Sequence, residues 1–598
     1  MKRYLIVLCI LILSTIIFAQ DIDYYFNPIT VTATRYPALF SGVNRRVTVI
    51  DSVELAAMPG YSLQDVLTSV VGVDMQRRGP LGVQAEAGIR GGSFEETLVL
   101  VDGMAVNDPQ TAHHNFDLPV SLQDVDHIEV LHGQGSGLYG ADALTGVIHV
   151  ITKNSTRRSV NAYSGQYGLV GGGMVIGAEH GKVSDRLSLS TSRSDGYTPY
   201  TEFEQVNVLN RSGFKWEGGK LDLQAGYNRK NFGANSFYST AFPDEHETTE
   251  TLRVSAAIDQ VSGAFSFSPR LSWKQHKDDF ILDNSRPEWY RNRHTSQKFV
   301  MQLPVYYKND TGLWGIGGQL KDESINSSNL GDHERRHGGV FASWSSPVWR
   351  GLQCNGNVYL YHYEDWGWKR WPSIDASWQL HKHLKFYAAA GESFRIPSFT
   401  DLYYVSPANM GNPDLRYSQA RSMETGLVTR YRKVRTGISV YSRQGRNVID
   451  WTRQRASDPW QVTNITELNT VGIESDIRVT RPFNPVESLY LGYSWIDSDK
   501  KAMDYSSKYA LNYLRYHAQL GFRVRLTRNL YTNWQFQWKK RINQQAYGVC
   551  DGGLSWGFNN RLRVNVNALN LFNADYTEID GVPMPGRWLS AGIDMDFK

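Results

Sequence analysis

Residues 589–598 read LSAGIDMDFK, and this stretch decides the fold class. Apolar and polar residues alternate in it without a miss, so that Leu589, Ile593 and Phe597 fall on one side while Ser590 and Asp594 fall on the other. Successive side chains of a β-strand point to opposite faces, and the alternation therefore predicts a strand with one apolar and one polar face. The same pattern recurs at residues 534–538 (WQFQW) and 562–568 (LRVNVNA).

The first residues have the organisation of a secretory signal peptide. Met1, Lys2 and Arg3 supply positive charge, an apolar run follows over residues 4–18, and Ala19 offers a small residue for cleavage. The run of about 15 residues is short of the roughly 20 that a membrane-spanning helix needs, which disfavours a retained anchor. We therefore expect residues 1–19 to be removed, and we expect the apolar strand faces to meet outer-membrane lipid in a β-barrel.

Composition excludes several other classes of protein. A net charge of +4 on 63 basic and 59 acidic residues gives no basic surface for nucleic acid. Only Cys354 and Cys550 remain after the predicted cleavage, too far apart in sequence for a metal or redox motif, and we expect no role for them. No pattern of a nucleophile and base, of paired carboxylates or of zinc ligands stands out, which predicts a protein that is not an enzyme and holds no cofactor.

The chain changes character near Lys153. Before it, we expect a small α+β domain over residues 41–153, with strands at 46–51, 97–101, 127–131 and 147–152. A helix is expected over residues 62–70, started by Ser62 with Asp65 as the acidic partner of a capping box. From residue 157 to 598 the helical pattern disappears. At about 20 residues for a strand and its connection, this part makes about 22 antiparallel strands, the size of plugged outer-membrane transporters.

Several motifs resemble one known family. Residues 29–35 (ITVTATR) resemble the TonB box of TonB-dependent outer-membrane receptors and the residues after it. Stretches similar to the plug domain of that family are LTSVVGVD (67–74), GIRG (88–91), VLVDG (99–103), VDHIEV (125–130) and GLYGADALTGVIHVITK (137–153). Stretches similar to its barrel are SFRIPSFTDLYY (393–404), GNPDL (411–415), Glu424 with Gly426, and NLFN (570–573). Within the family, the compact plug and barrel look most like the cobalamin (vitamin B12) transporters.

This resemblance implies a location, an architecture and partners. It implies a monomeric barrel in the outer membrane of a Gram-negative bacterium, with the plug inside the lumen. It also implies a scarce large ligand, most like cobalamin, and coupling to TonB through the periplasmic segment 20–40. The coupling residues are Ile29, Thr30, Val31, Thr32 and Ala33, whose β-branched side chains after Pro28 suit pairing with the sheet edge of another protein. An ordinary first strand of the plug is the alternative interpretation of this segment.

Two plug loops are the expected ligand contacts by the same resemblance. They are residues 76–86, a flexible turn with two arginines, and residues 106–117, which gather hydrogen-bonding groups beside an aromatic residue. A barrel loop around residue 237 could add an aromatic wall. The predicted contacts are Arg77, Arg78, Asn107, Asp108, Gln110, His113, His114, Asn115, Phe237 and Tyr238. We expect no metal at the adjacent histidines, because neighbours in an extended loop point apart.

Two departures from the family pattern and an alternative ligand class stay open. The cobalamin branch would imply calcium held by clustered aspartates, whereas the loops here carry the scattered acids Asp195, Glu202, Glu204, Asp244, Glu245 and Glu247. Lys598 follows Phe597, where the family usually ends on an aromatic residue. A ferric-siderophore or haem receptor shares all the coupling and barrel motifs, and it remains the alternative to a cobalamin receptor; a passive porin would lack the plug.

One string suggests a different function. Residues 135–140 (GSGLYG) match the G-x-G-x-x-G pattern of dinucleotide-binding proteins. A dinucleotide site needs a helix that opens at the glycines and an acidic residue after the next strand, whereas we expect a short turn that leads directly to the strand at 147–152. Such an enzyme would also need helices alternating with strands after residue 157. We therefore expect these glycines to allow close backbone packing in the plug.

Overall fold

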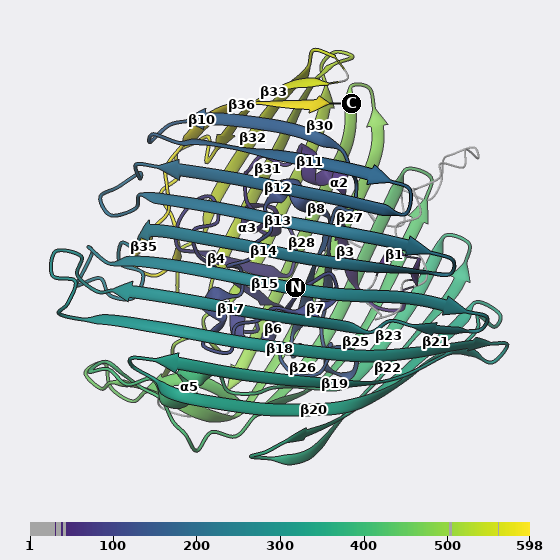
Figure 1. Ribbon diagram of the computed structural model, residues 1–598, viewed down its shortest axis with the longest axis horizontal. Coiled ribbons are helices and arrows are strands. Elements are labelled where there is room, and N and C mark those ends of the chain that lie inside the picture. The colour runs from purple at the N-terminus through teal and green to yellow at the C-terminus, as the bar shows by residue number, and fades with distance from the viewer. Residues whose placement is uncertain (1–29, 32–37, 40–42, 501–504, 560, 598) are drawn as a thin grey trace, which may run out of the picture.

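The computed structural model describes residues 30–31, 38–39, 43–500, 505–559 and 561–597. In this part of the chain, 22 antiparallel strands close into a barrel, and the N-terminal domain lies inside it. Figure 1 shows the purple N-terminal elements enclosed by the ring of blue, green and yellow strands. The predicted fold class is confirmed.

The barrel strands follow one another in chain order around the ring. The first half comprises β10 (Arg158–Gly165), β11 (Val170–His180), β12 (Val183–Ser194), β13 (Phe203–Trp216), β14 (Gly219–Gly233), β15 (His246–Ser262), β16 (Phe265–Phe267) continued by β17 (Arg270–Ile281), β18 (Arg291–Asn309), β19 (Gly312–Ser327), β20 (Gly331–Ser345) and β21 (Leu352–Tyr363). The second half comprises β22 (Gly367–His381), β23 (Leu384–Arg395), β25 (Ser418–Tyr431), β26 (Val434–Arg453), β27 (Trp460–Phe483), β28 (Val486–Lys500), β30 (Leu514–Arg525), β31 (Leu530–Arg541), β32 (Tyr547–Gly557), β33 (Leu562–Leu569) and β36 (Trp588–Phe597). Two short strands of two residues each lie beside the barrel strands: β24 (Asn409–Met410) pairs with β27, and β29 (Ser506–Ser507) pairs with β26.

Strand β36 closes the ring by pairing with β33 on one side and with β10 on the other. Its apolar residues point outward: Leu589 is 40% exposed, Ile593 50% and Phe597 45%. The polar residues between them are more covered and face the lumen. The alternation therefore sets the outer surface, because every second side chain meets the lipid.

The plug is built around a five-stranded mixed sheet in the order β3-β8-β9-β6-β7. These strands are β3 (Val47–Ile50), β6 (Thr97–Val101), β7 (Met104–Ala105), β8 (Val125–His132) and β9 (Gly146–Thr152), and a separate hairpin joins β4 (Val73–Arg77) to β5 (Ala85–Ile89). The four predicted plug strands are thus confirmed. Strand β3 lies at the sheet edge and pairs only with β8.

Short helices connect these strands. Helix α3 (Leu63–Leu67) begins at Ser62, whose side chain accepts from the Asp65 N–H while the Asp65 carboxylate accepts from the Ser62 N–H, the capping box that the sequence predicts. Helix α2 (Ser52–Ala57), capped by Asp51, was not predicted. The remaining helical turns are η2 (Phe94–Glu96), η3 (Ala112–His114), η4 (Leu122–Asp124) and α4 (Ser136–Tyr139). Apolar residues such as Leu67, Met75, Ile89 and Val150 form the plug core.

The two ends of the barrel differ. Short turns lie at the end where residues 153–157 lead from the plug into β10, and long loops lie at the other. The loop end carries α5 (Phe399–Tyr403), a helix where none was expected, and the hairpin β34 (Thr577–Ile579) with β35 (Val582–Pro583); Figure 1 shows α5 and β35 on the same side. No helix within the described ranges is long and apolar enough to cross a bilayer.

The predicted coupling segment is described only in part. Thr30–Val31 form strand β1, which pairs antiparallel with β2 (Ala38–Leu39). Ile29, Thr32 and Ala33 lie outside the described residues, as do the predicted signal peptide and Lys598.

Candidate functional site

Three of the predicted contact residues come together where the plug faces the loop end. Arg78, just after β4, places its Nη2 atom 2.5 Å from Oε1 of Glu86 and its Cζ atom 5.2 Å from the ring centre of Tyr238. The Nδ1 atom of His113 lies 2.7 Å from the same Glu86 oxygen. The carboxylate thus holds the two plug loops together, and the Tyr238 side chain, 44% exposed, covers them from the barrel loop.

Aromatic rings complete this surface. Phe94 in η2 lies 4.7 Å from the ring of His113 and 4.9 Å from the ring of Tyr509 in the loop between β28 and β30. Next to it, Lys508 lies 5.4 Å from the Tyr509 ring. We call this group the apex cluster, and it comprises Arg78, Glu86, Phe94, His113, Tyr238, Lys508 and Tyr509. An aromatic surface with a few polar groups is typical of sites that bind large organic ligands.

Burial and neighbouring charges set the ionisation of the apex cluster. Burial alone would raise the pKa of Glu86, but the charges of Arg78 and His113 lower it to about 2. Burial lowers the pKa of His113 below its ordinary value, although Glu86 opposes the shift. Burial also lowers the pKa of Lys508 to about 8. Near neutral pH the cluster therefore contains a fixed carboxylate and a lysine close to its titration point.

Arg77 points elsewhere. Its guanidinium binds the Glu578 carboxylate in β34 through Nε at 3.0 Å and Nη2 at 2.9 Å, and it reaches Oδ1 of Asp65 at 3.2 Å. Burial would raise the pKa of Glu578, but Arg77 lowers it to about 2. Arg77 therefore ties the plug loop to the hairpin β34–β35 rather than facing the apex cluster.

Most of the second predicted loop is occupied by contacts of its own. Asn107 accepts the Val99 N–H at 2.7 Å and donates to the Thr97 carbonyl at 2.9 Å, while Asn115 accepts the Asp108 N–H at 2.9 Å. The Asp108 carboxylate accepts from Lys274 at 2.9 Å. These three side chains shape the loop and dock it on the wall.

The last two predicted contacts in that loop lie at the boundary between plug and wall. Gln110 donates from Nε2 to Oδ2 of Asp278 at 3.1 Å. His114 lies between Asp117, 3.0 Å from its Nδ1 atom, and Asp278, 3.4 Å from its Nε2 atom. Both residues are buried beneath the apex cluster.

Phe237 belongs to an apolar layer beneath the loops. Leu81 and Val83 at the tip of the first plug loop are 3% and 5% exposed and pack against apolar side chains of the wall. We call this layer the apical seal; it comprises Leu81, Val83, Leu169, Phe203, Phe232, Ala234, Phe237, Val582 and Trp588. Because Arg78 donates to the Phe237 carbonyl, the apex cluster and the apical seal share the same plug loop.

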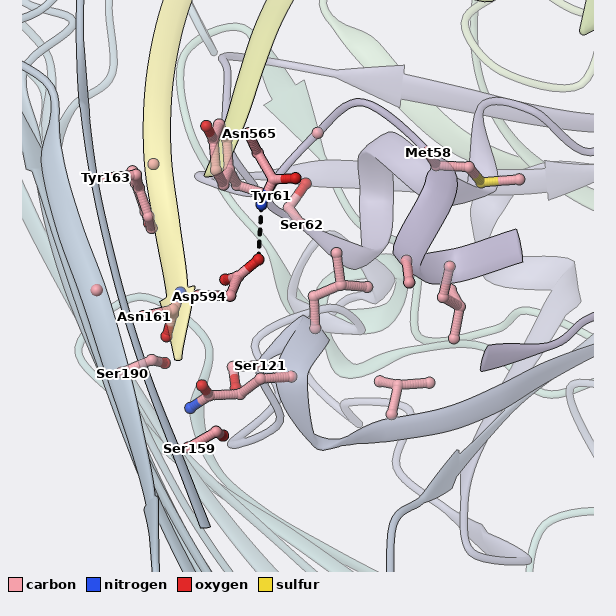
Figure 2. A pocket seen from close by; sticks show the side chains of 18 of the residues that line it. Met58, Tyr61, Ser62, Ser121, Ser159, Asn161, Tyr163, Ser190, Asn565 and Asp594 are labelled. Atoms are coloured by element: carbon pink, nitrogen blue, oxygen red, sulfur yellow. Dashed lines mark hydrogen bonds between the residues drawn. The ribbon is translucent and has the colours of Figure 1, made fainter. Parts of the chain in front are cut away.

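Below the seal, a cavity of about 820 Å³ separates the plug from the wall. Figure 2 shows Met58, Tyr61 and Ser121 of the plug on one side of it and Tyr163 and Ser190 of the wall on the other. The lining reaches from Leu81 under the seal to exposed residues such as Arg157 at the turn end. The cavity is thus a half-channel that is open toward the turn end and closed by the seal.

Many lining residues of the half-channel carry neutral hydrogen-bonding groups, beside charged residues such as Lys230 and Asp594. The neutral lining residues include Ser62, Ser121, Ser159, Asn161, Ser190, Ser192, Gln205, Asn207, Asn228, Asn533 and Asn567. Tyr61 stacks on Tyr163 at 4.3 Å, and its hydroxyl is hydrogen-bonded to Ser590 at 2.9 Å. The half-channel could therefore hold a large polar ligand through many weak hydrogen bonds.

The opposite side of the plug is docked tightly. Helix α4 lies against β21, β22 and β23. A Cβ atom on Gly137 would approach the Ser373 Oγ atom to 2.4 Å, so only glycine fits there. The Phe394 N–H donates to the Ser136 hydroxyl at 3.2 Å. We call this surface the docked face. Residues 136–139 of the G-x-G-x-x-G string form a single helical turn, and the short turn expected after it leads to β9. Gly135 packs within the plug against Ala143 and Val147, as expected, whereas Gly137 packs on the wall.

Buried charges extend the docked face toward the N-terminus of the plug. Arg90 places its Nη1 atom 2.6 Å from Glu424 and its Nη2 atom 3.0 Å from Glu474. Arg46 reaches Glu474 at 2.9 Å and Asp476 at 2.8 Å. Glu474, whose side chain is fully buried, therefore bridges two arginines that lie far apart in the plug sequence.

Sequence reasoning missed Tyr61, Glu474, Lys508 and Tyr509. Glu474 sits in a strand whose alternation says only that it faces the lumen. The pair of Lys508 and Tyr509 gave a usable signal, since a cation beside an aromatic residue in a barrel loop is a common binding surface. Tyr61 gave none, because its partners belong to β10 and β36.

Comparison with known proteins places the chain in a family. The family model for the TonB dependent receptor-like β-barrel matches residues 142–571, and the TonB-dependent receptor plug domain matches residues 41–147. A vitamin B12 transporter BtuB from Photobacterium profundum is 24% identical, with 96% of both chains covered. Another from Vibrio vulnificus (strain CMCP6) is 25% identical, with 75% of this chain and 74% of the relative covered.

Solved structures share the fold at lower identity. The siderophore receptor PirA from Pseudomonas aeruginosa superposes with a TM-score of 0.74 at 16% identity, covering 92% of this chain and 99% of that one. The copper transporter OprC superposes with a TM-score of 0.79 at 14% identity, covering 93% and 98%. These likenesses show a shared architecture.

The barrel model covers well over half of the 598 residues. A member of this family is an outer-membrane transporter of Gram-negative bacteria and not an enzyme, and it works with TonB and a transported ligand. The chain belongs to the TonB-dependent receptors.

Proposed function

We propose that this receptor binds cobalamin at the apex cluster and passes it through the half-channel into the periplasm. The observation that carries the proposal is the alignment with a vitamin B12 transporter over 96% of both chains. The serine and asparagine side chains in the lining of the half-channel support it, because cobalamin carries many amide side chains that exchange hydrogen bonds with such groups.

The ligand contacts in this proposal are Arg78, His113 and Tyr238, with Lys508 and Tyr509 added from the opposite loop. Arg77 and Phe237 act through the plug loop, one by binding Glu578 and the other within the apical seal. Asn107, Asp108, Gln110, His114 and Asn115 hold the second loop in place. Ligand that displaces Tyr238 or Arg78 would loosen the loop that carries Leu81 and Val83.

Coupling to TonB is proposed to act through residues 29–33. The extended backbone of Thr30–Val31 supports this role, because a segment already paired as a strand can exchange its partner for the edge of another sheet. Ligand must favour the plug state in which the segment is released, since only a difference in affinity between two states can shift their populations. Residues 1–19, 20–40, 41–153 and 157–598 are the proposed signal peptide, coupling segment, plug and barrel.

A force that TonB exerts on the coupling segment would act first on the residues that follow this segment. Residues 43–46 lead directly into β3, the edge strand of the plug sheet, which pairs with β8 over only Val47–Ile50. Helices α2 and α3 follow β3, and the loop between them contributes Met58 and Tyr61 to the half-channel. A pull that peels β3 would therefore draw these residues away from the wall and widen the half-channel.

One observation favours a second candidate, an anionic ferric chelate. Arg78 lies over the Tyr238 ring, and Lys508 lies between aromatic rings, 5.8 Å from Trp451 and 5.4 Å from Tyr509. Cations framed by aromatic residues suit an anionic aromatic ligand.

Equilibrium binding to detergent-folded protein separates the two candidates. Cyanocobalamin is titrated alone and then against a ferric siderophore mixture and haem as competitors. We expect saturable cyanocobalamin binding that resists both competitors. It should weaken at least tenfold in Tyr238→Ala but not in Tyr307→Ala, which changes a residue on the outer face of β18. Binding of the ferric chelate alone would move the substrate to iron.

A further inference from the structure

Five titratable side chains meet beneath the apex cluster, at the boundary between plug and wall. His114 and Asp117 come from the plug loop that contains η3, Glu247 from β15, and His276 and Asp278 from β17. All five are buried, with exposed fractions between 0% and 6%. The proposed uptake of cobalamin does not use them as a group.

Three of them, His114, Asp117 and His276, place one donor atom each within 4.8 Å of one another. The Nδ1 atom of His114 lies 3.0 Å from Oδ2 of Asp117, and the Nε2 atom of His276 lies 3.8 Å from the same oxygen. Glu247 adjoins this group through its Oε1 atom, 4.0 Å from the His114 Nδ1 atom. In a tetrahedral zinc site with bonds of about 2.0–2.1 Å, ligand atoms are about 3.3 Å apart, so the distances from Asp117 to the two histidines need shifts of less than about 1 Å.

Each of these four groups is oriented by a second contact on its other atom. Asp278 lies 3.4 Å from the His114 Nε2 atom, and the Thr251 hydroxyl lies 3.0 Å from the His276 Nδ1 atom. When those nitrogens carry the protons, the opposite ring nitrogens turn their lone pairs toward Asp117. Such partners are typical of metal-ligating histidines.

The carboxylates show the same arrangement. Lys230 donates to Oδ1 of Asp117 at 2.8 Å, which leaves Oδ2 on the side of the histidines. The Tyr238 hydroxyl donates to Oε2 of Glu247 at 3.0 Å, which leaves Oε1 facing His114. The donor atoms of His114, Asp117 and His276 therefore lie close together while their other atoms are held, and the Glu247 Oε1 atom, which also accepts from Gln84 at 3.5 Å, lies beside His114.

The buried carboxylates of the region outnumber its lysines. Four carboxylates (Asp108, Asp117, Glu247 and Asp278) stand against Lys230 and Lys274, and the remaining two charges are balanced either by protons on His114 and Glu247 or by a divalent cation. The Nε2 atom of His276 and the Oδ1 atom of Asp278 are also buried without a hydrogen-bond partner. Buried polar atoms of this kind require an explanation, and a divalent cation would supply one.

We propose that His114, Asp117 and His276 bind one divalent transition-metal ion that fastens the plug to the wall, with Glu247 as the adjacent carboxylate that moves in as the fourth ligand. Two imidazoles and two carboxylates suit Zn²⁺, whereas Ca²⁺ and Mg²⁺ prefer oxygen ligands alone. Because Tyr238 of the apex cluster bonds to Glu247, the metal would also join the ligand surface to this fastening. The inference does not depend on which ligand is transported.

Metal binding is tested on the full-length, detergent-folded protein purified without a polyhistidine tag and stripped with chelator. Zinc chloride is titrated by calorimetry, the bound metal is counted by mass spectrometry, and Co²⁺ is added to record the visible absorption of a tetrahedral site. The wild-type protein is expected to bind one ion, with at least tenfold weaker binding in His276→Ala and in Asp117→Asn. Zinc should raise the thermal unfolding midpoint of the wild-type protein but not that of the His276→Ala and Asp117→Asn variants.

His517→Ala is the matched control, because His517 is an equally buried histidine with an unpartnered Nδ1 atom on β30. It should bind zinc as the wild-type protein does. If wild-type and His276→Ala proteins hold the same amount of metal with the same affinity and both are folded by circular dichroism, the proposal is wrong and protons balance the charge of the cluster.

Discussion

On the docked face the plug meets the wall through buried ion pairs and a glycine that touches Ser373, whereas on the other side a cavity of about 820 Å³ separates the two. The docked face joins Arg90 to Glu424 and Glu474 at 2.6 and 3.0 Å. Serine and asparagine are frequent in the lining of the half-channel, which also carries charged residues such as Lys153, Arg563 and Asp594.

The difference assigns separate tasks to the two faces of one small domain. Removing one partner of a buried ion pair costs about 3–5 kcal/mol, so the docked face resists displacement. The half-channel leaves a cavity between plug and wall, next to the pairs of Lys230 with Asp117 and of Arg186 with Asp124, and many of the residues that line it follow the edge strand β3. Arg46 directly precedes β3, so a pull on the coupling segment has to break its pairs with Glu474 and Asp476 first. We then expect the N-terminal part of the plug to move while α4 and Arg90 stay on the wall.

The largest expected effect comes from removing the coupling segment. Deletion of residues 29–33 should abolish uptake of labelled cyanocobalamin in cells but leave binding to the purified protein unchanged, because neither face of the plug is touched. Loss of binding in a normally folded deletion would show that the segment also supports the ligand site. Deletion of an equal length within residues 20–25 is the control.

The second prediction tests the docked face itself. Glu474→Ala should reduce the opening free energy of the plug by about 3–5 kcal/mol, because Arg46 and Arg90 lose a shared buried carboxylate. Ser190→Ala, in the half-channel, should change it by less than about 0.5 kcal/mol. Hydrogen exchange of β3 and β8 measures both, and equal effects would remove the distinction between the faces.

Much of the fold is predictable from sequence, and much of the site is not. Alternation at 589–598 predicts the barrel wall because the lipid imposes one apolar face on every strand, and local capping by Ser62 and Asp65 predicts α3. The approach of Arg78, His113 and Tyr238 depends on how the strands tilt and how the plug sits, which no local pattern records. Their identity as candidates came from the family resemblance.

The same limit applies to the docked face and to the histidines. Glu474 is one of many lumen-facing polar residues in sequence, and it differs only because two plug arginines meet it. His113 and His114 are neighbours in sequence but turn to different environments, one toward Glu86 and the other toward Asp117. Sequence could not distinguish these environments.

A smaller effect is expected from the apical seal. Replacing Leu81 and Val83 together by serine should hydrate the layer that closes the half-channel, and liposomes that contain the variant should leak small solutes. Leu138→Ser in α4 makes the same kind of change inside the plug, where Leu138 packs in a cluster of plug residues that includes Ala143 and Val147, and should leave liposomes tight. A leak in the Leu138 variant alone would place the passage on the wrong side.

The smallest effect is a pH dependence of the link between Arg77 and Glu578. Because the pKa of Glu578 is lowered to about 2 from 4.5, this link stabilises the folded loop fully above pH 4.5 and is lost as the pH falls toward 2. The protection of the β34 and β35 amides against hydrogen exchange, measured relative to the intrinsic exchange rate at each pH, should therefore fall over that range. Glu578→Gln should exchange faster at neutral pH and show little of this dependence; an unchanged profile would exclude the link.

A disulfide bridge tests most directly whether the plug opens on the side of the half-channel. A Cβ atom at Gly553 would lie 3.9 Å from that of Pro59, within the range of about 3.5–4.5 Å for disulfides. The cysteine pair is placed in a Cys354→Ser, Cys550→Ser background, and cyanocobalamin uptake is measured before and after reduction. The oxidised Pro59→Cys, Gly553→Cys bridge should block uptake until it is reduced, while each single variant, Pro59→Cys or Gly553→Cys, should keep uptake near the background rate. Unimpaired uptake with the oxidised bridge would contradict opening on this side.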